Sequence, residues 1–330
     1  MSESVTDWRG LHSLAFNGVS VLVTGGAGFI GSHLALALVE LGADVTALDD
    51  LSNAGPNPEK TIAPAKLVVG SILDQDLLAQ CVSGRRFVFH QAALGSVPKS
   101  VERPREFDLV NVTGTLNVLE ACRAAGVERV MFAASSSVYG DSQILPKIET
   151  MPPAPRSPYA ATKGAGEGLM AAYAASYGLD TVSLRYFNIF GPRQRADSAY
   201  AAVIAAFAKS LLGGQRPVIF GDGSQSRDFT YVDNAVHANL LAARSHERLN
   251  GAAINIACGQ RTTVNELARL MAQEVQRPDL TPIYKPARAG DVPHSLADLT
   301  LAGERLGYGP IVQFAPGLVN TVRWYTQGQL

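Results

Sequence analysis

Three residues, Ser135, Tyr159 and Lys163, have the types and spacing needed to take a proton from an alcohol. Tyr159 and Lys163 lie four residues apart in an alanine-rich helical stretch, so their side chains share one face of the helix. A free tyrosine has a pKa of about 10, but a nearby ammonium group favours the phenolate and lowers that pKa. Ser135 follows an apolar run and could hydrogen-bond the same hydroxyl. Alone, such a pair is usually a chance surface pair, and such a serine is usually a turn residue.

A glycine-rich turn lies upstream of these residues. The apolar run at 19–24 has the length and β-branched content of a buried strand, and Gly25, Gly28 and Gly31 follow it at the start of a helical pattern. The first glycine allows a tight turn, the second lets backbone approach a pyrophosphate, and the third lets helix pack on strand. The unpaired N–H groups at the helix start favour a phosphate. The stretch therefore predicts a dinucleotide site.

Two acids indicate which dinucleotide to expect. A second apolar run at 45–48 ends in Asp49 and Asp50. They lie about 20 residues beyond the glycines, where a carboxylate can hydrogen-bond a ribose 2′-OH. A carboxylate there would repel a 2′-phosphate, so NAD is favoured over NADP. Together with Ser135, Tyr159 and Lys163, the site predicts hydride transfer.

The elements that must position these residues follow an α/β rhythm. Short β-rich runs alternate with longer helical patterns, which predicts a parallel sheet with crossover helices. Further strands are expected at 67–69, 87–90, 130–134 and 181–186, and helices at 107–125 and 160–177. Beyond Gly191 the rhythm loosens. We predict a Rossmann-type doubly wound parallel sheet over 1–187, to which 228–257 return, and a smaller mixed α/β substrate-binding region formed by 188–227 and 258–330.

Composition excludes several classes of function. The chain has 330 residues, 47% of them hydrophobic, and 28 basic against 29 acidic residues give a net charge of −1. With no basic block, we expect no nucleic-acid partner and no membrane-surface partner. No apolar segment is long enough to span a bilayer, and no secretory leader is recognisable, so a cytoplasmic protein is expected. Cys81, Cys122 and Cys258 are odd in number and far apart, which argues against disulfides and against a metal site.

The predicted helix at 160–177 contains Gly164, Gly166 and Gly168, each costing about 1 kcal/mol relative to alanine. Glycines there indicate close helix packing. A homodimer built on the faces of this helix and of the helix at 107–125 would explain them, and internal packing would explain them nearly as well.

At this point the sequence resembles a family, the extended short-chain dehydrogenase/reductases, and within it the nucleotide-sugar 4-epimerases. The likeness is greatest to epimerases that act on UDP-N-acetylhexosamines. The matching segments run over nearly the whole chain and are TGGAGFIGSH from Thr24, HQAALGSVPKS from His90, NVTGTLNVLEA from Asn111, SSSVYG from Ser135, SPYAATK from Ser157, LRYFNIFGPRQ from Leu184, GDGSQSRDFTYVDN from Gly221 and RAGDVPHSLAD from Arg288.

The resemblance implies a mechanism. The phenolate of Tyr159 would remove the proton of the sugar 4-OH while the C4 hydride passes to NAD⁺, giving a 4-keto sugar. The keto sugar would turn over and receive the hydride on its opposite face, so that NAD⁺ is regenerated and need not leave. Lys163 would hold the nicotinamide ribose and lower the pKa of Tyr159, and Ser135 would bridge the sugar O4 and Tyr159.

The resemblance also implies two sets of contacts. NAD would be bound by Gly25, Gly28, Phe29, Ile30, Gly31, Asp49, Asp50, Asn53, Ser71, Ile72, Gln91, Ala92, Ala93, Asn111, Tyr159, Lys163 and Tyr186. The UDP-sugar would be bound by Gly95, Ser96, Ser135, Ser136, Ser137, Asn188, Gln194, Ala202, Val203, Val218, Phe220, Arg227, Arg288, Asp291 and Ser295. Arg227 and Arg288 would clamp the diphosphate, a task suited to a guanidinium fork. Ser71 departs from the family, which usually has an acid there.

Substrate choice in this family depends on one position, which matches Ser295. A bulky residue there restricts the enzyme to UDP-glucose and UDP-galactose, and a small one admits an N-acetyl group. We therefore predict a UDP-N-acetylglucosamine 4-epimerase. Activity on UDP-glucose, or on UDP-N-acetylglucosaminuronate with its C6 carboxylate, stays open.

Three rival readings fit the residues less well. A sugar-nucleotide dehydratase of this superfamily carries two acids just after the active-site serine, where this chain has Ser136 and Ser137. A reductase that draws on NADPH would prefer a basic residue near Asp49. A non-catalytic NAD-binding regulator would not need all of Ser135, Tyr159 and Lys163.

Overall fold

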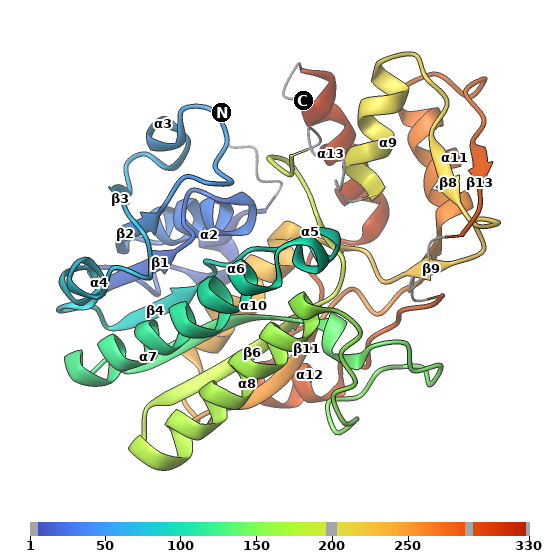
Figure 1. Ribbon diagram of the computed structural model, residues 1–330. Coiled ribbons are helices and arrows are strands. Elements are labelled where there is room, and N and C mark those ends of the chain that lie inside the picture. The colour runs from blue at the N-terminus through green and yellow to red at the C-terminus, as the bar shows by residue number, and fades with distance from the viewer. Residues whose placement is uncertain (1–5, 196–202, 288–292, 328–330) are drawn as a thin grey trace.

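The computed structural model describes residues 6–195, 203–287 and 293–327, and its centre is a seven-stranded parallel sheet (Figure 1). The strand order is β11-β6-β5-β4-β1-β2-β3. The chain adds β2 and β3 on one side of β1 and the later strands, from β4 on, on the other side. This switch leaves a crevice at the carboxyl ends of β1 and β4. The strands are β1 (Ser20–Thr24), β2 (Asp44–Asp49), β3 (Lys66–Val69), β4 (Phe87–His90), β5 (Arg129–Ser135), β6 (Asp180–Tyr186) and β11 (Ala252–Ile256). The predicted Rossmann-type α/β fold is confirmed, with each expected strand in place.

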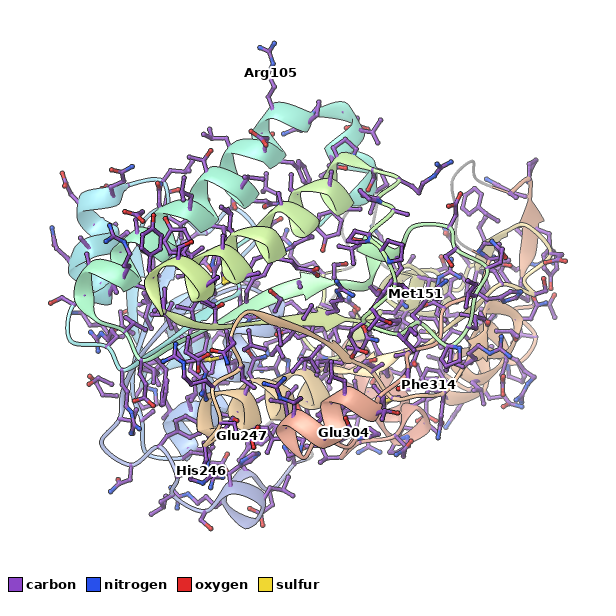
Figure 2. The ribbon with its side chains drawn as sticks, turned by 90° about the horizontal axis from the view of Figure 1, so that it is seen from below. Arg105, Met151, His246, Glu247, Glu304 and Phe314 are labelled. Carbon is purple, nitrogen blue, oxygen red and sulfur yellow. The ribbon has the colours of Figure 1, made fainter. Side chains whose placement is uncertain are left out.

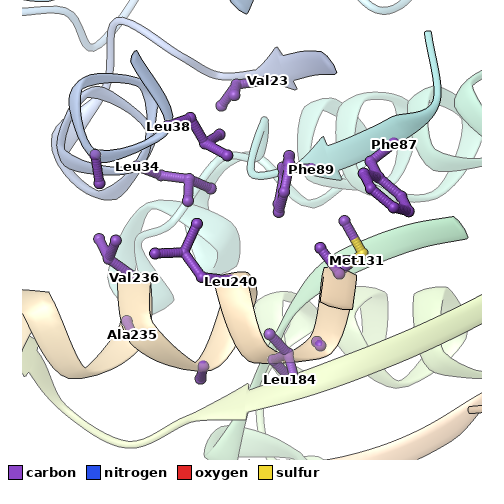
Figure 3. Packing of buried hydrophobic residues seen from close by; sticks show 14 of the residues in the cluster. Val23, Leu34, Leu38, Phe87, Phe89, Met131, Leu184, Ala235, Val236 and Leu240 are labelled. Carbon is purple, nitrogen blue, oxygen red and sulfur yellow. The ribbon is translucent and has the colours of Figure 1, made fainter. Parts of the chain in front are cut away.

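Helices cover both faces of this sheet (Figure 1). One face carries α2 (Phe29–Glu40), α10 (Val232–Arg244) and α12 (Thr300–Leu306), and the other carries α4 (Gln75–Val82), α7 (Gly114–Ala125) and α8 (Pro158–Tyr177). Figure 3 shows Leu34 and Leu38 of α2 and Leu240 of α10 directed toward Phe89 and Met131 of the sheet. The burial of these apolar side chains stabilises the packing of α2 against the strands.

The helix that carries Tyr159 begins two residues earlier than the alanine-rich pattern indicates. Ser157 caps it by accepting a hydrogen bond from the Ala160 N–H at 3.2 Å, and Pro158 occupies the first turn. The predicted helix at 107–125 is instead three pieces: α6 (Pro104–Asp108), a π-helix (Leu109–Thr113) and α7. Insertions of this kind often accompany functional sites.

Shorter elements complete the sheet region. They are α1 (Trp8–His12), α3 (Pro58–Ile62), α5 (Val97–Glu102) and a 3₁₀ helix (Ser136–Tyr139). Along the described ranges, no helix is both long and apolar enough to cross a bilayer.

A smaller region lies beyond the carboxyl ends of the strands (Figure 1). Its strands are β7 (Ile189–Phe190), β8 (Val218–Phe220), β9 (Ser226–Arg227), β10 (Thr230–Tyr231), β12 (Thr262–Thr263) and β13 (Ile283–Lys285), and its helices are α9 (Val203–Leu212), α11 (Val264–Glu274) and α13 (Phe314–Thr326). It has its own core, in which the ring of Phe314 lies 5.7 Å from that of Phe190 and 5.6 Å from that of Phe229. By contrast α12, which carries Glu304, packs on α10 and β11 (Figure 2).

Two buried histidines fasten α1 to α10. His12 Nε2 lies 2.9 Å from His237 Nδ1, and a guanidinium nitrogen of Arg244 lies 3.4 Å from His12 Nδ1. Burial, aided by the charge of Arg244, lowers the pKa of His12 to about 4, and burial, aided by His12, lowers the pKa of His237 to about 4. Both rings are therefore neutral in the fold near pH 7.

We expect this pair to make the protein less stable in mild acid. Because the folded pKa values lie below the unfolded value of 6.5, the unfolded chain binds more protons, and the stabilisation is lost as the pH falls from about 6.5 toward 4. Urea unfolding at a series of pH values should show the decline, and His12→Gln should make it shallower, while the buried His33, His90 and His237 keep part of it. His246→Gln, at an exposed position, is the control. An equal decline in the His12 variant and the wild type would contradict the assignment.

Candidate active site

The glycine-rich turn between β1 and α2 is shaped by two glycines at which a side chain would not fit. Gly25 has a φ of +67°, and a Cβ there would lie 2.6 Å from the amide nitrogen of Ala92. A Cβ on Gly31 would lie 2.0 Å from the carbonyl oxygen of Gly25. The turn therefore lies close to both α2 and the loop after β4, as a dinucleotide site requires.

The amino end of α2 fits the pyrophosphate of NAD. Gly28 caps the helix without a side-chain hydrogen bond, and the first turn carries no acidic residue. Within the described residues, the N–H groups of Phe29 and Ile30 have no acceptor. The partial positive charge of the helix end is thus open to an anion, which these two N–H groups would hold.

Asp49, at the end of β2, fastens the glycine-rich turn to the sheet. Its Oδ2 accepts a hydrogen bond from the Ala27 N–H at 2.9 Å, and its Oδ1 accepts one from the Leu51 N–H at 2.8 Å. Burial raises the pKa of this carboxyl, and the backbone N–H groups oppose the rise. Asp50 is exposed and accepts a hydrogen bond from the Ser52 N–H at 3.0 Å. Ribose binding by these acids stays a prediction.

Most other residues predicted to bind NAD follow the carboxyl ends of neighbouring strands. They are Asn53 after β2, Ser71 and Ile72 after β3, Gln91, Ala92 and Ala93 after β4, and Tyr186 at the end of β6. Tyr186 donates to Gln91 Oε1 at 3.2 Å and accepts from Asn239 Nδ2 at 2.6 Å. Burial raises the pKa of Tyr186 to about 12, so it stays a neutral phenol. Asn239 was not among the predicted residues, because nothing in the sequence pattern of α10 marks it.

Asn111 lies in the π-helix and connects the loop after β4 to α8, the helix that carries Tyr159. Its Oδ1 accepts from the Leu94 N–H at 2.8 Å, and its Nδ2 donates to the Leu94 carbonyl at 3.1 Å and to Thr162 Oγ1 at 3.1 Å. The loop held in this way carries Gly95 and Ser96, and Ser96 caps α5. Asn111 thus positions two predicted substrate residues, and its own contact with NAD stays a prediction.

The structure brings Ser135, Tyr159 and Lys163 to one place at the carboxyl end of β5. Ser135 is the last residue of that strand, and its side chain is near enough to the hydroxyl of Tyr159 to favour a lower pKa of that hydroxyl. The Ser137 N–H donates to Ser135 Oγ, at 3.2 Å, which orients the serine. A substrate hydroxyl that reached Tyr159 would therefore also meet Ser135.

The expected effect of Lys163 on the pKa of Tyr159 stays a prediction, because Lys163 contacts other groups in this structure. Lys163 Nζ donates to the carbonyl oxygen of Ala133 at 2.7 Å and lies 4.8 Å from the ring centroid of Phe132. Burial raises the pKa of Tyr159, which the nearby Ser135 only partly offsets. Burial also lowers the pKa of Lys163 to about 8, against the opposing charge of Glu167. The four-residue spacing is confirmed as a shared face, but it does not determine where a long flexible side chain ends.

A pocket of about 270 Å³ in the smaller region is lined in part by residues predicted to bind the substrate. It is lined by the predicted residues Asn188, Gln194, Val203, Val218, Phe220 and Arg227. Sequence analysis missed the other lining residues, Ile189, Phe190, Ile204, Phe207, Ile219, Gln225, Phe229 and Val264. The i, i+3 spacing of Ile204 and Phe207 on α9 was the available signal, but it indicates a core face as readily as a pocket.

Two predicted substrate residues carry polar atoms that the protein leaves unsatisfied. Ser137 Oγ and Gln194 Oε1 are buried and have no hydrogen-bond partner within the described chain. Buried polar atoms normally have partners, so these two fit contacts to a polar ligand. Ser136 adjoins Ser137 in the 3₁₀ helix.

Arg227 belongs to β9, and Ser295 lies in the segment that runs beside this strand. Arg227 donates to the carbonyl oxygens of Ser226 at 3.0 Å and Pro293 at 3.1 Å while it lines the pocket. The N–H of Ser295 donates to the carbonyl of Ser226 at 3.0 Å, so the chain at 293–295 runs beside β9. Ala202, Arg288 and Asp291 lie outside the described residues. Among the described ones, no group of three or more His, Cys, Asp or Glu side chains could hold a metal ion.

Comparison with known proteins agrees with this geometry. The model of the NAD dependent epimerase/dehydratase family matches residues 21–257. A putative UDP-glucose 4-epimerase of Methanocaldococcus jannaschii is 38% identical over 307 residues, which cover 92% of this chain and 97% of that protein.

Two solved structures are similar over nearly their whole length. A UDP-N-acetylglucosamine 4-epimerase of Methanobrevibacter ruminantium in complex with UDP-N-acetylmuramic acid has a TM-score of 0.89 and 38% identity, over 94% of this chain and 99% of that one. A UDP-glucose 4-epimerase of Thermotoga maritima with UDP-glucose has a TM-score of 0.89 and 37% identity, over 94% and 100%. The chain therefore belongs to the NAD dependent epimerase/dehydratase family, among its UDP-sugar 4-epimerases, and uses NAD as its cofactor.

Proposed function

We propose that the protein inverts C4 of a UDP-N-acetylhexosamine, interconverting UDP-N-acetylglucosamine and UDP-N-acetylgalactosamine through a 4-keto sugar. The observation that supports this reaction most strongly is that Tyr159, on α8, and Ser135 lie near each other at the carboxyl end of β5. The N-acetyl preference is supported by the small side chain at Ser295, and by the similarity to an enzyme named for UDP-N-acetylglucosamine.

Tyr159, Ser135 and Lys163 would each have a separate role in the reaction. Tyr159 would take the proton of the sugar 4-OH and return it to O4 after inversion, and Ser135 would hold O4 at hydrogen-bond distance from Tyr159. Bound NAD⁺ supplies the acceptor and then the donor of the C4 hydride. Lys163 would have to leave the Ala133 carbonyl to reach the nicotinamide ribose, and from there its charge would favour the phenolate.

The substrate can be named by one experiment. The purified protein, with no cofactor added, is incubated separately with UDP-N-acetylglucosamine, UDP-glucose and UDP-N-acetylglucosaminuronate, and C4 inversion is followed by NMR. We expect inversion without added NAD, fastest with UDP-N-acetylglucosamine. If UDP-N-acetylglucosaminuronate is inverted fastest, this sugar, which has a carboxylate at C6, would be the substrate instead.

No inversion of any of these sugars, even after NAD is supplied, would favour a function of another class. The protein would then be a non-catalytic NAD-binding regulator. The nearness of Ser135 to Tyr159 disfavours that alternative, because a regulator needs neither of them.

Ser295→Tyr should change the choice of sugar. A tyrosine beside β9 would fill the space that we assign to the N-acetyl group, and steric conflicts of this size cost about 1–3 kcal/mol, or roughly 10–100-fold in kcat/KM. We expect that loss for UDP-N-acetylglucosamine and little change for UDP-glucose, measured as kcat/KM for both. Ser83→Tyr, at an exposed position after α4, is the control. An unchanged ratio of the two values would remove Ser295 as the determinant.

We also propose that the protein is a homodimer through α7 and α8. Gly166 is pressed against the ring of Phe132 inside the fold, so internal packing explains that glycine. Gly168 faces open space, where a Cβ would meet nothing within 4 Å. Leu116 of α7 is 38% exposed and offers this face an apolar side chain that a partner would cover. Sedimentation velocity would give the oligomeric state.

A further inference from the structure

The loop between β7 and α9 touches both halves of the molecule. Its described part, residues 191–195, is called the bridging loop here. His33 Nε2, on α2, lies 3.0 Å from the carbonyl oxygen of Pro192 in this loop. Arg195 Nη1 donates to the carbonyl oxygen of Ala54 at 2.9 Å, in the loop that follows β2. The hydroxyl of Tyr325, on α13, donates to the carbonyl oxygen of Gln194.

One side of the bridging loop belongs to the substrate pocket. Gln194 lines that pocket, its Nε2 donates to the Ile189 carbonyl at 3.0 Å, and its buried Oε1 has no partner in the described chain. A ligand that bonds this oxygen would fix Gln194, and with it the next residue, Arg195.

The other side of the bridging loop meets the elements assigned to NAD. Helix α2 presents its N–H groups to the pyrophosphate, and Ala54 directly follows Asn53 in the segment assigned to the adenosine ribose. Arg195 therefore joins a pocket loop to a cofactor loop that is 141 residues away in the chain. Its guanidinium is a charged donor, and hydrogen bonds to charged groups are the stronger ones.

We propose that Arg195 is a positioning residue that couples the retention of NAD to the occupancy of the UDP-sugar pocket. The inference rests on the proposed placement of the adenosine ribose beside Asp49 and Asn53. With the pocket occupied, the bridging loop holds Ala54 in place and slows the departure of NAD. Because coupling between two sites is reciprocal, bound NAD also strengthens the binding of UDP.

The test measures NAD release from the holoenzyme, without catalysis. Wild type, Arg195→Ala and Arg195→Lys are diluted with an NAD-hydrolysing enzyme as a trap, with and without saturating UDP, and bound NAD is quantified over time. UDP should slow release from the wild type. Arg195→Ala should release NAD about tenfold faster and respond less to UDP, within the range that one charge-assisted hydrogen bond carries. Arg195→Lys, which keeps a cationic donor, should fall between them.

Arg86→Ala is the matched control, because Arg86 is an exposed arginine paired with Glu128 at the amino end of the sheet. It should release NAD at the wild-type rate. Equal release rates for Arg195→Ala and wild type, with equal responses to UDP, would overturn the proposal and leave the proposed function standing. If Arg195→Ala does not fold, Arg195→Lys carries the same comparison. A wild-type protein that never holds NAD would overturn both.

Discussion

Replacement of Tyr159 by phenylalanine is expected to lower kcat by about 10²–10⁴-fold, the usual contribution of a positioned proton-transfer group. The change removes the only atom that Tyr159 offers to the sugar 4-OH and leaves the ring in place. Because the N–H groups at the start of α2 are predicted to hold the pyrophosphate, the variant should keep its NAD. C4 inversion by NMR and the NAD content of the purified protein measure the two effects separately.

Tyr177→Phe provides a matched control on the same helix, since the side chain of Tyr177 is 58% exposed near the end of α8. It should leave kcat unchanged. A Tyr159→Phe enzyme with wild-type turnover would show that another group takes the proton. Loss of NAD along with activity would show instead that the tyrosine serves mainly to bind the cofactor.

Removal of Arg129 should produce the second large effect, on stability. Its guanidinium is buried at the start of β5, donates to Asp180 Oδ2 at 2.7 Å, and donates to the carbonyl oxygens of Ala242 at 2.7 Å and Glu247 at 2.8 Å. Arg129→Ala would leave the buried carboxylate of Asp180 without its cation. Loss of one partner from a buried pair costs about 3–5 kcal/mol of the free energy of unfolding.

Urea unfolding followed by circular dichroism would measure this loss as a fall in the midpoint concentration. The exposed pair of Arg86 and Glu128 is the comparison, because surface ion pairs contribute about 0–1 kcal/mol. If Arg86→Ala and Arg129→Ala lowered the free energy of unfolding by the same small amount, burial would not explain the importance of the Arg129–Asp180 pair. The double variant Arg129→Met with Asp180→Leu should recover part of the stability, since it leaves no unpaired charge.

The sequence predicted most of the backbone because its strands and glycines obey local rules. The apolar runs, the glycine spacing and the Tyr159 to Lys163 interval each depend on neighbouring residues, and the structure places all of them as expected. The orientation of Lys163 could not be predicted, since the Ala133 carbonyl and Phe132 ring reach it only through tertiary packing.

The same difference between local sequence patterns and tertiary packing applies to the residues that line the pocket. The sequence motifs predicted Asn188 and Phe220 as substrate residues. Nothing in the sequence around Ile204 and Phe207 separates a pocket wall from a core face. The contact between Arg195 and Ala54 joins residues that no local pattern relates.

The position of β11 has a consequence for how the chain folds as it leaves the ribosome. In the finished sheet β6 lies between β5 and β11, and all seven of its residues are buried. Its outer neighbour β11 is not complete until residue 256, after β7 to β10, α9 and α10 have been made. At about 5–20 residues per second, β6 is an unprotected sheet edge for several seconds of translation. Unpaired edges of this kind recruit other strands, so the nascent chain is most exposed to aggregation, and most dependent on chaperones, in that interval.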